Sequence, residues 1–446
     1  MDILIMAGQL MLSLSILIVL HEGGHFLPAR LFNTRVEKFY LFFDPGFALF
    51  KKQIGETEYG IGWLPLGGYV KISGMIDESF DTEQMSQEPQ EWEFRSKPAW
   101  QRLIIMLGGV TVNFILGLLI FGFVLWYYGQ EYLPNENIKY GIAVDSLGRE
   151  IGLQEGDHVL SINGKDFDKF NSRVLLREIV INDARSMQVR RNGEVVDIAI
   201  DPKWTGELSA YKNKGASIFA PRVPFVAAGF SDDSPAKAAG LTERDSIIAL
   251  NGTPTPFFTS FVEEIKPYKG ETVTVTVIRD GQTKDISMKT TPAGKIGVAP
   301  ADPTYFFGSE RQEFTFAEAM PAGAALGWGT LTDQLKAFGR MFSGDIKVTE
   351  SLGGFASIGS MFGASWNWER FWTMTAILSL ILAFMNLLPI PALDGGHVMF
   401  LLYEVVSGRK PSDKFMEYAT IVGFVIVIGL VLLANGLDIK RMLFNS

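Results

Sequence analysis

Cysteine is absent from this sequence of 446 residues, and charged residues make up only 20% of it. Without cysteine the chain forms no disulfide bond and offers no thiolate, so any metal site must use His, Asp or Glu. The charged fraction lies below the roughly 25% that is typical of soluble globular proteins. The net charge of −9 at pH 7 argues against a broad basic surface, so nucleic acid is not an expected partner.

Apolar residues are abundant instead and make up 47% of the chain. A bilayer core needs about 20 mostly apolar residues per helix, and four stretches meet that requirement. They are Ile3 to Leu20 and the segments between Arg102 and Glu131, between Arg370 and Asp394, and between Glu417 and Asp438. A cleavable signal peptide explains the first stretch less well, because Asp2 replaces the usual basic residues and no A-x-A site follows.

Lysine and arginine gather at one end of most of these stretches, and this bias sets orientation through the positive-inside rule. The residues concerned are Arg30, Arg35, Lys38, Arg95, Lys97, Arg102, Arg409, Lys410 and Lys414, whereas Lys440 and Arg441 favour the opposite orientation. The bias predicts an N-terminus outside the cytoplasm, four spans, and residues 129–370 on the outer side of the membrane.

An internal repeat lies in this outer segment, where residues 152–164 recur as residues 240–252 with an offset of 88. The offset also relates Asn192-Gly193 to Asp280-Gly281, which indicates two copies of one domain. Each copy alternates β-branched runs with hairpin turns and resembles a PDZ domain of the bacterial protease type. Such domains usually bind an extended peptide by strand addition, but a role only as a spacer or size filter is an equally good interpretation.

The first apolar stretch runs into His21-Glu22-Gly23-Gly24-His25, an H-E-x-x-H pattern. Residues i and i+4 lie on one face of a helix, so both imidazoles can bind one zinc ion while Glu22 takes a proton from bound water. Ionisable side chains are costly at membrane depth, which favours a functional role over a pair of interfacial histidines.

Catalytic zinc usually has three protein ligands and one open position, so a third ligand is required. The third span runs into residues 386–397, N-L-L-P-I-P-A-L-D-G-G-H. Its two prolines end an ordinary helix, and non-helical backbone at this depth is tolerated only in a protein interior or beside a cavity. The predicted orientation places Asp394 at the same membrane level as His21 and His25. Chemistry alone leaves Asp394 and His397 as alternative third ligands.

H-E-x-x-H at the end of a first span and N-x-x-P-x-P-x-L-D-G at the end of a later one together resemble the site-2 protease family of intramembrane zinc metalloproteases. Four spans with two PDZ-like copies between the second and third are similar to its RseP type, and the resemblance covers nearly the whole chain. It implies a Zn²⁺ cofactor bound by His21, His25 and Asp394, with Glu22 as the general base. His397 is then left outside the ligand set.

The resemblance also implies contacts with a substrate. Residues 58–71 look like the membrane-dipping β-hairpin of the RseP type, whose edge strand can pair with substrate. The implied substrate-binding residues are Gly60, Ile61, Gly62, Asn386, Pro389 and Pro391. One departure from the family is that Gly23 and Gly24 stand where a bulky residue and then Gly are usual, and we expect them to loosen the helix.

The implied activity is hydrolysis of a peptide bond within or beside a transmembrane helix, in regulated intramembrane proteolysis. The implied substrates are anti-sigma-factor-like single-span proteins and remnant signal peptides, trimmed beforehand by another protease. The implied location is a bacterial inner membrane, with PDZ-like domains in the periplasm and the active site near the cytoplasmic side. Membrane lipid is a further expected partner, and the ligands of the PDZ-like domains are not implied.

The predicted fold class is a multi-pass α-helical membrane protein with a metalloprotease core and two tandem PDZ-like α+β domains between helices two and three. We expect two spans with H-E-x-x-H and the hairpin at 1–128, PDZ-like domains at 129–217 and 218–305, an amphipathic membrane-surface segment at 306–370, and the last two spans at 371–446.

Two rival functions belong to other classes. A membrane-anchored PDZ receptor with a structural metal site would make Glu22 dispensable, whereas proteolysis makes it essential. A metal transporter would need polar residues in several spans, but away from the two motifs these spans contain little beyond Gln9, Ser13, Ser15 and Asn113.

Overall fold

The computed structural model describes residues 2–65, 67–75, 88–209 and 218–444. Leu66, inside the expected hairpin, and the expected domain boundary at residue 217 lie outside the described residues. By length and composition, four helices of the described chain can cross a membrane: α1 (Asp2–Leu31), α2 (Ala99–Tyr128), α12 (Trp368–Leu387) and residues Lys414–Leu443 of α14 (Asp413–Phe444). The prediction of a helical membrane protein with sheet-rich regions is confirmed at this level.

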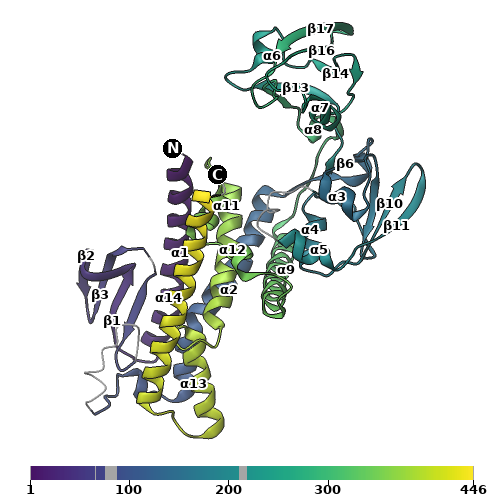
Figure 1. Ribbon diagram of the computed structural model, residues 1–446. Coiled ribbons are helices and arrows are strands. Elements are labelled where there is room, and N and C mark those ends of the chain that lie inside the picture. The colour runs from purple at the N-terminus through teal and green to yellow at the C-terminus, as the bar shows by residue number, and fades with distance from the viewer. Residues whose placement is uncertain (1, 66, 76–87, 210–217, 445–446) are drawn as a thin grey trace. The chain divides into compact units, whose positions relative to one another are not determined.

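The chain divides into two compact units. The first comprises Met1–Gly129, Glu313–Leu335 and Ser351–Ser446, and the second comprises Gln130–Gln312 and Lys336–Glu350. In the first unit α1, α2, α12 and α14 form a bundle, and α13 (Asp394–Ser407) lies at the end opposite the N-terminus (Figure 1).

Small residues bring the helices of the first unit into close contact, as is usual in membranes. A Cβ atom added at Gly24 would lie only 2.5 Å from the carbonyl oxygen of Gly108, so α1 and α2 cross backbone to backbone. In the same way, a Cβ atom at Gly323 of α9 (Phe316–Ser343) would lie 2.2 Å from the backbone nitrogen of Gly122 in α2. The expectation that Gly24 loosens the helix is therefore wrong, because α1 continues to Leu31 and uses this glycine for packing.

The few polar side chains in the spans connect helices to one another. Ser13 in α1 and Thr375 in α12 are hydrogen-bonded over 2.9 Å, and the Gln9 amide donates to the Gly363 carbonyl over 3.1 Å. The Ser379 hydroxyl of α12 donates to the backbone carbonyl of Asn113 in α2 over 2.6 Å. These hydrogen bonds stabilise the bundle, as expected because lipid offers polar side chains no hydrogen-bond partner.

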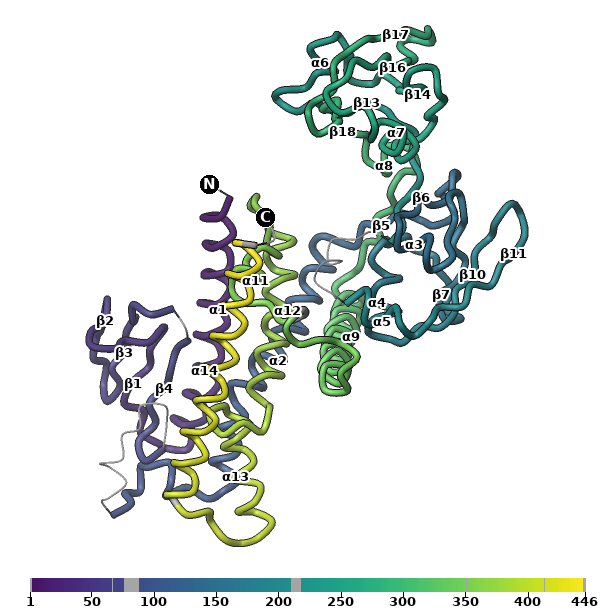
Figure 2. The backbone as a smooth tube through the Cα atoms, viewed as in Figure 1, coloured from purple at the N-terminus to yellow at the C-terminus, as the bar shows by residue number. Residues whose placement is uncertain are grey.

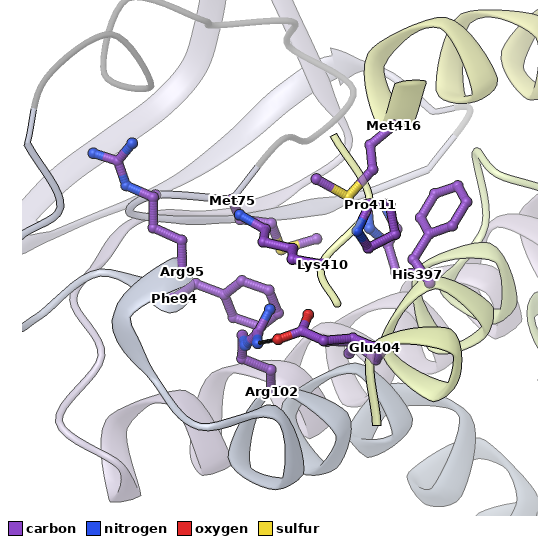
Figure 3. A pocket seen from close by; sticks show the side chains of 12 residues that line it. Met75, Phe94, Arg95, Arg102, His397, Glu404, Lys410, Pro411 and Met416 are labelled. Atoms are coloured by element: carbon purple, nitrogen blue, oxygen red, sulfur yellow. Dashed lines mark hydrogen bonds and ion pairs between the residues drawn. The ribbon is translucent and has the colours of Figure 1, made fainter. Parts of the chain in front are cut away.

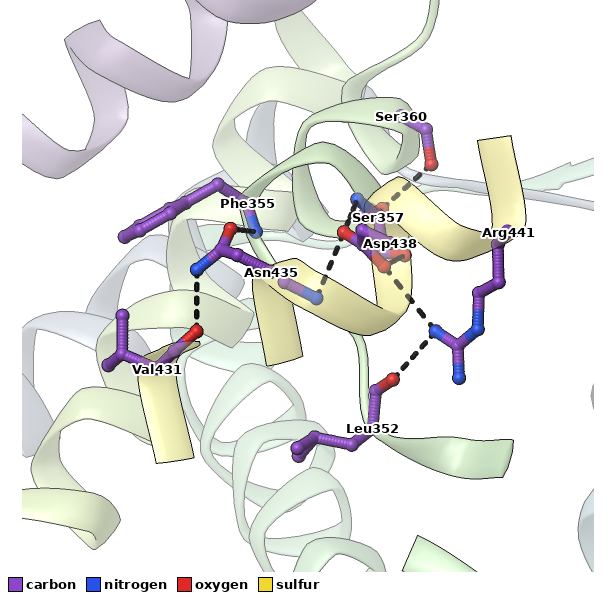
Figure 4. A network of polar contacts seen from close by, with 9 residues as sticks. Leu352, Phe355, Ser357, Ser360, Val431, Asn435, Asp438 and Arg441 are labelled. Carbon is purple, nitrogen blue, oxygen red and sulfur yellow. Dashed lines mark hydrogen bonds and ion pairs between the residues drawn. The ribbon is translucent and has the colours of Figure 1, made fainter. Parts of the chain in front are cut away.

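The start of α11 (Phe355–Phe362), which follows α10 (Val348–Ser351), is held by α14 (Figure 4). Gly354 precedes α11 and has no side chain to cap it, so its first amides need acceptors from elsewhere. The Asp438 carboxylate of α14 accepts hydrogen bonds from the amides of Gly354 and Ser357 at 3.0 and 2.8 Å. Arg441 adds a hydrogen bond to the Leu352 carbonyl at 2.7 Å.

A four-stranded sheet follows α1 in the chain, with β1 (Val36–Leu41), β2 (Phe43–Ile54), β3 (Thr57–Leu64) and β4 (Tyr69–Ile72) in the order β2-β3-β1-β4. The prediction of one hairpin over residues 58–71 is wrong, because β3 and β4 are separated by β1. The hairpin is β2–β3, with Gly55 at φ +61° in its turn, and β3 runs parallel to β1. Alternation of residue types identifies strands but not their partners, so the sequence could not give this order.

The sheet lies beside α1, with β1 and β4 as the strands in contact with it (Figure 2). β4 is an edge strand, paired with β1 on one side and with no other described strand on its second side. A short 3-10 helix, Phe94–Ser96, precedes α2.

The second unit contains the two sequence repeats, each with its own apolar core. The elements of the first repeat are β6 (Ile142–Val144), α3 (Ser146–Ile151), β7 (His158–Ile162), β8 (Lys165–Asp166), α4 (Val174–Val180), β10 (Ser186–Arg191), β11 (Glu194–Ala199), α5 (Lys203–Ser209) and β12 (Phe219–Pro221). Those of the second are β13 (Phe225–Phe230), α6 (Pro235–Ala238), β14 (Ser246–Leu250), β15 (Thr253–Pro254), α7 (Phe258–Ile265), β16 (Thr272–Arg279), β17 (Gln282–Lys289) and β18 (Val298–Pro300).

Five further short elements lie within residues 130–312: β5 (Gln130–Pro134), β9 (Lys169–Phe170), β19 (Glu310–Gln312), the 3-10 helix Asn135–Asn137 and α8 (Pro303–Phe307). The offset of 88 holds for structure as well as for sequence, because β7 and β8 correspond residue by residue to β14 and β15. Each repeat also buries an equivalent aspartate, 1% exposed, that pairs with an arginine of the neighbouring strand. The pairs are Asp157 with Arg191 and Asp245 with Arg279.

Candidate metal centre

Three side chains converge where α1, α2 and the start of α13 meet. The Nε2 atoms of His21 and His25 lie 3.2 and 3.4 Å from Oδ2 of Asp394, and 3.3 Å from each other. The helical spacing of the two histidines puts both rings on one face of α1. Asp394 reaches the same place because α12 ends at Leu387, before the two prolines, and α13 starts at Asp394 itself.

The residues present fit a zinc ion. Zinc with four bonds of about 2.0–2.1 Å in tetrahedral directions separates its ligand atoms by about 3.3 Å, which matches all three spacings. Oδ2 of Asp394 is buried, and apart from the two imidazoles it meets no hydrogen-bond donor among the described residues, so a cation between the three groups would satisfy it. Two imidazoles and one carboxylate also form a known ligand set of catalytic zinc.

His397 is not among the converging groups. The cluster of ligand atoms within 4.8 Å of one another, among the described residues, comprises His21, His25 and Asp394. His397 instead lines a small pocket of about 50 Å³ together with the Arg102–Glu404 ion pair (Figure 3). The geometry thus favours Asp394 over His397, the alternative that ligand chemistry left open.

Glu22 lies beside this cluster and against β4. A Cβ atom added at Gly68, just before β4, would lie 2.5 Å from Cγ2 of Ile18 in α1, so the missing side chain lets the chain pass close to α1, and it would lie 3.6 Å from Cγ of Glu22. The backbone amide of Val70 in β4 donates a hydrogen bond to the Glu22 carboxylate. The free edge of the sheet and the acidic side chain therefore share one site.

Asn386 lies beside the cluster, and Pro391 lies beside the start of α13. The Nδ2 atom of Asn386 is 3.2 Å from Nε2 of His21. Pro391 packs under the start of α13, where a Cβ atom at Gly396 would lie 2.4 Å from its Cα. The segment of Pro389 and Pro391 therefore shapes the turn that delivers Asp394.

Gly60, Ile61 and Gly62 lie elsewhere, in the interior strand β3. All three pair with β2, and Gly60 and Ile61 also pair with β1 on the other side. Gly60 and Ile61 therefore do not lie at a strand edge, and within the segment 58–71 expected to contain that edge, the edge strand is β4. The edge next to Glu22 is β4.

Sequence reasoning missed the contribution of α2. The carbonyl oxygen of Ile105 lies 2.8 Å from Nδ1 of His25, and Nδ2 of Asn113 lies 3.3 Å from Nδ1 of His21. Between them, a Cβ atom at Gly109 would lie 2.4 Å from Nε2 of His25. One signal was available in the sequence: Asn113 is the single asparagine of an apolar span, and residues 105, 109 and 113, spaced by four, lie on the same face of a helix.

The sequence profile of peptidase family M50 matches residues 9–430. The chain belongs to this family. Similar proteins include the regulator of sigma E protease of Haemophilus influenzae, 28% identical over 98% of this chain and 98% of that protein. The regulator of sigma-E protease RseP of Escherichia coli K12 is 27% identical, also over 98% of both chains. A Neisseria meningitidis serogroup A protein whose name assigns it to the zinc metalloproteases is 27% identical over 96% of this chain and 97% of that protein.

Family membership settles the class of chemistry. This M50 peptidase is a membrane zinc metalloprotease, a hydrolase acting on peptide bonds, and Zn²⁺ is its cofactor. The sequence predictions of the family, the enzyme class and the metal are confirmed. The His-His-Asp cluster is the candidate place for that metal in the described part of the chain.

Proposed function

We propose that this protein cleaves single-span membrane proteins within or beside their transmembrane helices, with His21, His25 and Asp394 as zinc ligands and Glu22 as the general base. One observation carries the proposal: three ligand atoms at tetrahedral spacing meet next to a carboxylate inside a bundle of membrane-length helices. A receptor or a structural metal site does not need an acid–base group there.

The chemistry divides between the metal and the chain. Zinc supplies, when bound, a lowered pKa for a coordinated water and polarisation of the scissile carbonyl. Glu22 accepts the proton of the attacking water and returns it to the leaving amine. The Val70 amide orients the Glu22 carboxylate for both transfers.

The substrate must leave its helical conformation to be cut, because a helix hides its carbonyls in i to i+4 hydrogen bonds. The outer edge of β4 lies beside Glu22 and pairs with no described strand, and an extended segment can pair with such an edge. Tyr69 to Lys71 of β4 lie within residues 58–71, the segment whose edge strand the sequence resemblance assigned to substrate pairing. Asn386 is close enough to the ligands to hydrogen-bond the backbone of a bound segment.

The substrate class follows from the relatives that are named regulators of sigma-E protease. We propose anti-sigma-factor-like single-span proteins and remnant signal peptides as substrates, already trimmed by another protease. The protein lies in a bacterial inner membrane, and its two repeats act as PDZ-like domains, at residues 129–217 and 218–305, on the periplasmic side. The metal centre lies near the cytoplasmic side, as the lysine and arginine bias supports.

Cleavage by purified protein tests the proposal. A tagged single-span substrate without a large outer domain is incubated with wild type and with Glu22→Gln, each with and without a zinc chelator. Wild type is expected to cut, while the variant and the chelated samples lose at least about 100-fold in rate, the lower range for a general base. Glu22→Gln is also expected to retain zinc. Equal cleavage in all samples would show that another site is responsible.

A further inference from the structure

The two histidines of the metal centre have different partners on the side that faces away from the cluster. Their Nε2 atoms point toward Asp394, so each Nδ1 atom points away from it. A neutral imidazole that binds a metal through Nε2 carries its proton on Nδ1 and needs an acceptor for it. For His25 the acceptor is the Ile105 carbonyl, at 2.8 Å.

The corresponding partner of His21 is the side-chain amide of Asn113. Its Nδ2 atom lies 3.3 Å from Nδ1 of His21, and this arrangement would set one donor against another in the metal-bound tautomer. Asn113 is only 1% exposed, and its Oδ1 atom is buried and has no hydrogen-bond partner in the described part of the chain. A rotation of the Asn113 amide by 180° about its Cβ–Cγ bond exchanges Nδ2 and Oδ1. Oδ1 then faces the proton on Nδ1 of His21.

The backbone of Asn113 is fixed independently of this contact. Ser379 of α12 donates a hydrogen bond to its carbonyl over 2.6 Å, which ties α2 to the helix that leads to Asn386. Gly109, one turn earlier on the same face, leaves room for both rings, because a Cβ atom there would lie 2.6 Å from Cε1 of His21. Residues 105, 109 and 113 thus form one stripe of α2 that supports both histidines.

We propose that Asn113 is a positioning residue of the metal centre. Its side-chain carbonyl accepts the Nδ1 proton of His21 and so holds the tautomer in which Nε2 binds zinc. Asn113 touches neither substrate nor metal and acts only through His21. The inference rests on the proposed function, since it takes His21 as a ligand.

The test measures zinc affinity of the full-length protein in detergent, by competition with a chelator of known affinity. Asn113→Leu removes the acceptor at similar volume and is expected to weaken zinc binding about 10- to 100-fold, the usual effect of losing an outer partner of a metal-bound histidine. Asn113→Asp keeps an acceptor and is expected to stay within a few-fold of wild type. Gln9→Met is the matched control, because it also removes a buried amide from a span, and it should leave affinity unchanged.

The absorption spectrum of the cobalt-substituted protein gives a second readout that a merely structural role would not move. A changed visible band in Asn113→Leu, restored in Asn113→Asp, supports the proposal. Wild-type affinity and spectrum in a folded Asn113→Leu variant would overturn it, as would equal losses in the Leu and Asp variants. If the Leu variant does not fold, Asn113→Ala provides the same comparison.

The variant His21→Ala tests separately whether His21 is a zinc ligand. His21→Ala should lose zinc in the same assay. If His21→Ala keeps wild-type affinity, the proposed ligand set is wrong, and the inference about Asn113 is overturned with it. If His21→Ala loses zinc but Asn113→Leu does not, only the role of Asn113 is refuted.

Discussion

Gly23 and Gly24 are neighbours in the metal-binding motif, but their surroundings differ. Nothing lies within 4 Å of a Cβ atom added at Gly23, whereas one at Gly24 meets the backbone of Gly108 at 2.5 Å. Backbone atoms cannot move aside as a flexible side chain can. The second glycine is therefore a packing requirement of α1 against α2, and the first is not.

These two positions form a matched pair for mutation. Gly24→Ala is expected to push α1 from α2, displace His25 and abolish stoichiometric zinc binding. Gly23→Ala is expected to retain zinc and to stabilise the helix by about 0.5–1 kcal/mol, the usual gain from replacing a mid-helix glycine. Elemental analysis and thermal denaturation measure the two effects. Stoichiometric zinc in Gly24→Ala would contradict the packing argument.

At the scale of elements, each repeat of the second unit joins two strands through a buried ion pair. In the second repeat Arg279 of β16 donates to both carboxylate oxygens of Asp245, and the Thr242 amide donates to Oδ2. Burial raises the pKa of Asp245, but the hydrogen bonds from Arg279 and Thr242 outweigh it and hold the pKa below its usual value of 3.8. The recurring aspartate of the sequence repeat thus has a structural reason.

This pKa predicts how the second repeat responds to acid. Because the folded pKa lies below the unfolded one, the stabilisation is complete above pH 3.8 and is lost as the pH falls through the folded pKa. We expect hydrogen exchange in β14 and β16, corrected for intrinsic rates, to show lower protection at pH 3 than at pH 5. Asp245→Asn should lose about 1.5–3 kcal/mol at pH 5 and show a flatter pH dependence.

The first repeat serves as the internal control in this experiment, because it has a separate core and its own ion pair. Its protection should be the same in wild type and in Asp245→Asn at either pH. An Asp245→Asn protein with the same pH dependence as wild type would show that this carboxylate is not the responsible group.

At the scale of the whole molecule, we propose that the PDZ-like pair acts as a size filter, the interpretation in which the bulk of a substrate's outer domain decides whether it is cut. We expect a single-span substrate with a short outer tail to be cut at least about tenfold faster than one with a compact folded domain on that side. The same folded domain placed on the cytoplasmic side should have little effect. Equal rates for all three substrates, measured with the full-length protein, would exclude the filter.

Several features follow from the amino-acid sequence alone. Four apolar stretches define the membrane-length helices, since the bilayer core requires about 20 apolar residues. The His21–His25 spacing puts both imidazoles on one helical face, and the prolines at 389 and 391 end α12 before Asp394. These are local properties, decided by residues a few positions apart.

Only the tertiary structure decided which distant groups meet. It brought Asp394 rather than His397 to His21 and His25, placed β1 between β3 and β4, and brought Asn113 of α2 behind His21. It also showed Gly24 as a contact with Gly108 rather than a weak point in α1. The physical reason is that strand pairing and helix crossing depend on packing between segments far apart in the chain, which local periodicity does not encode.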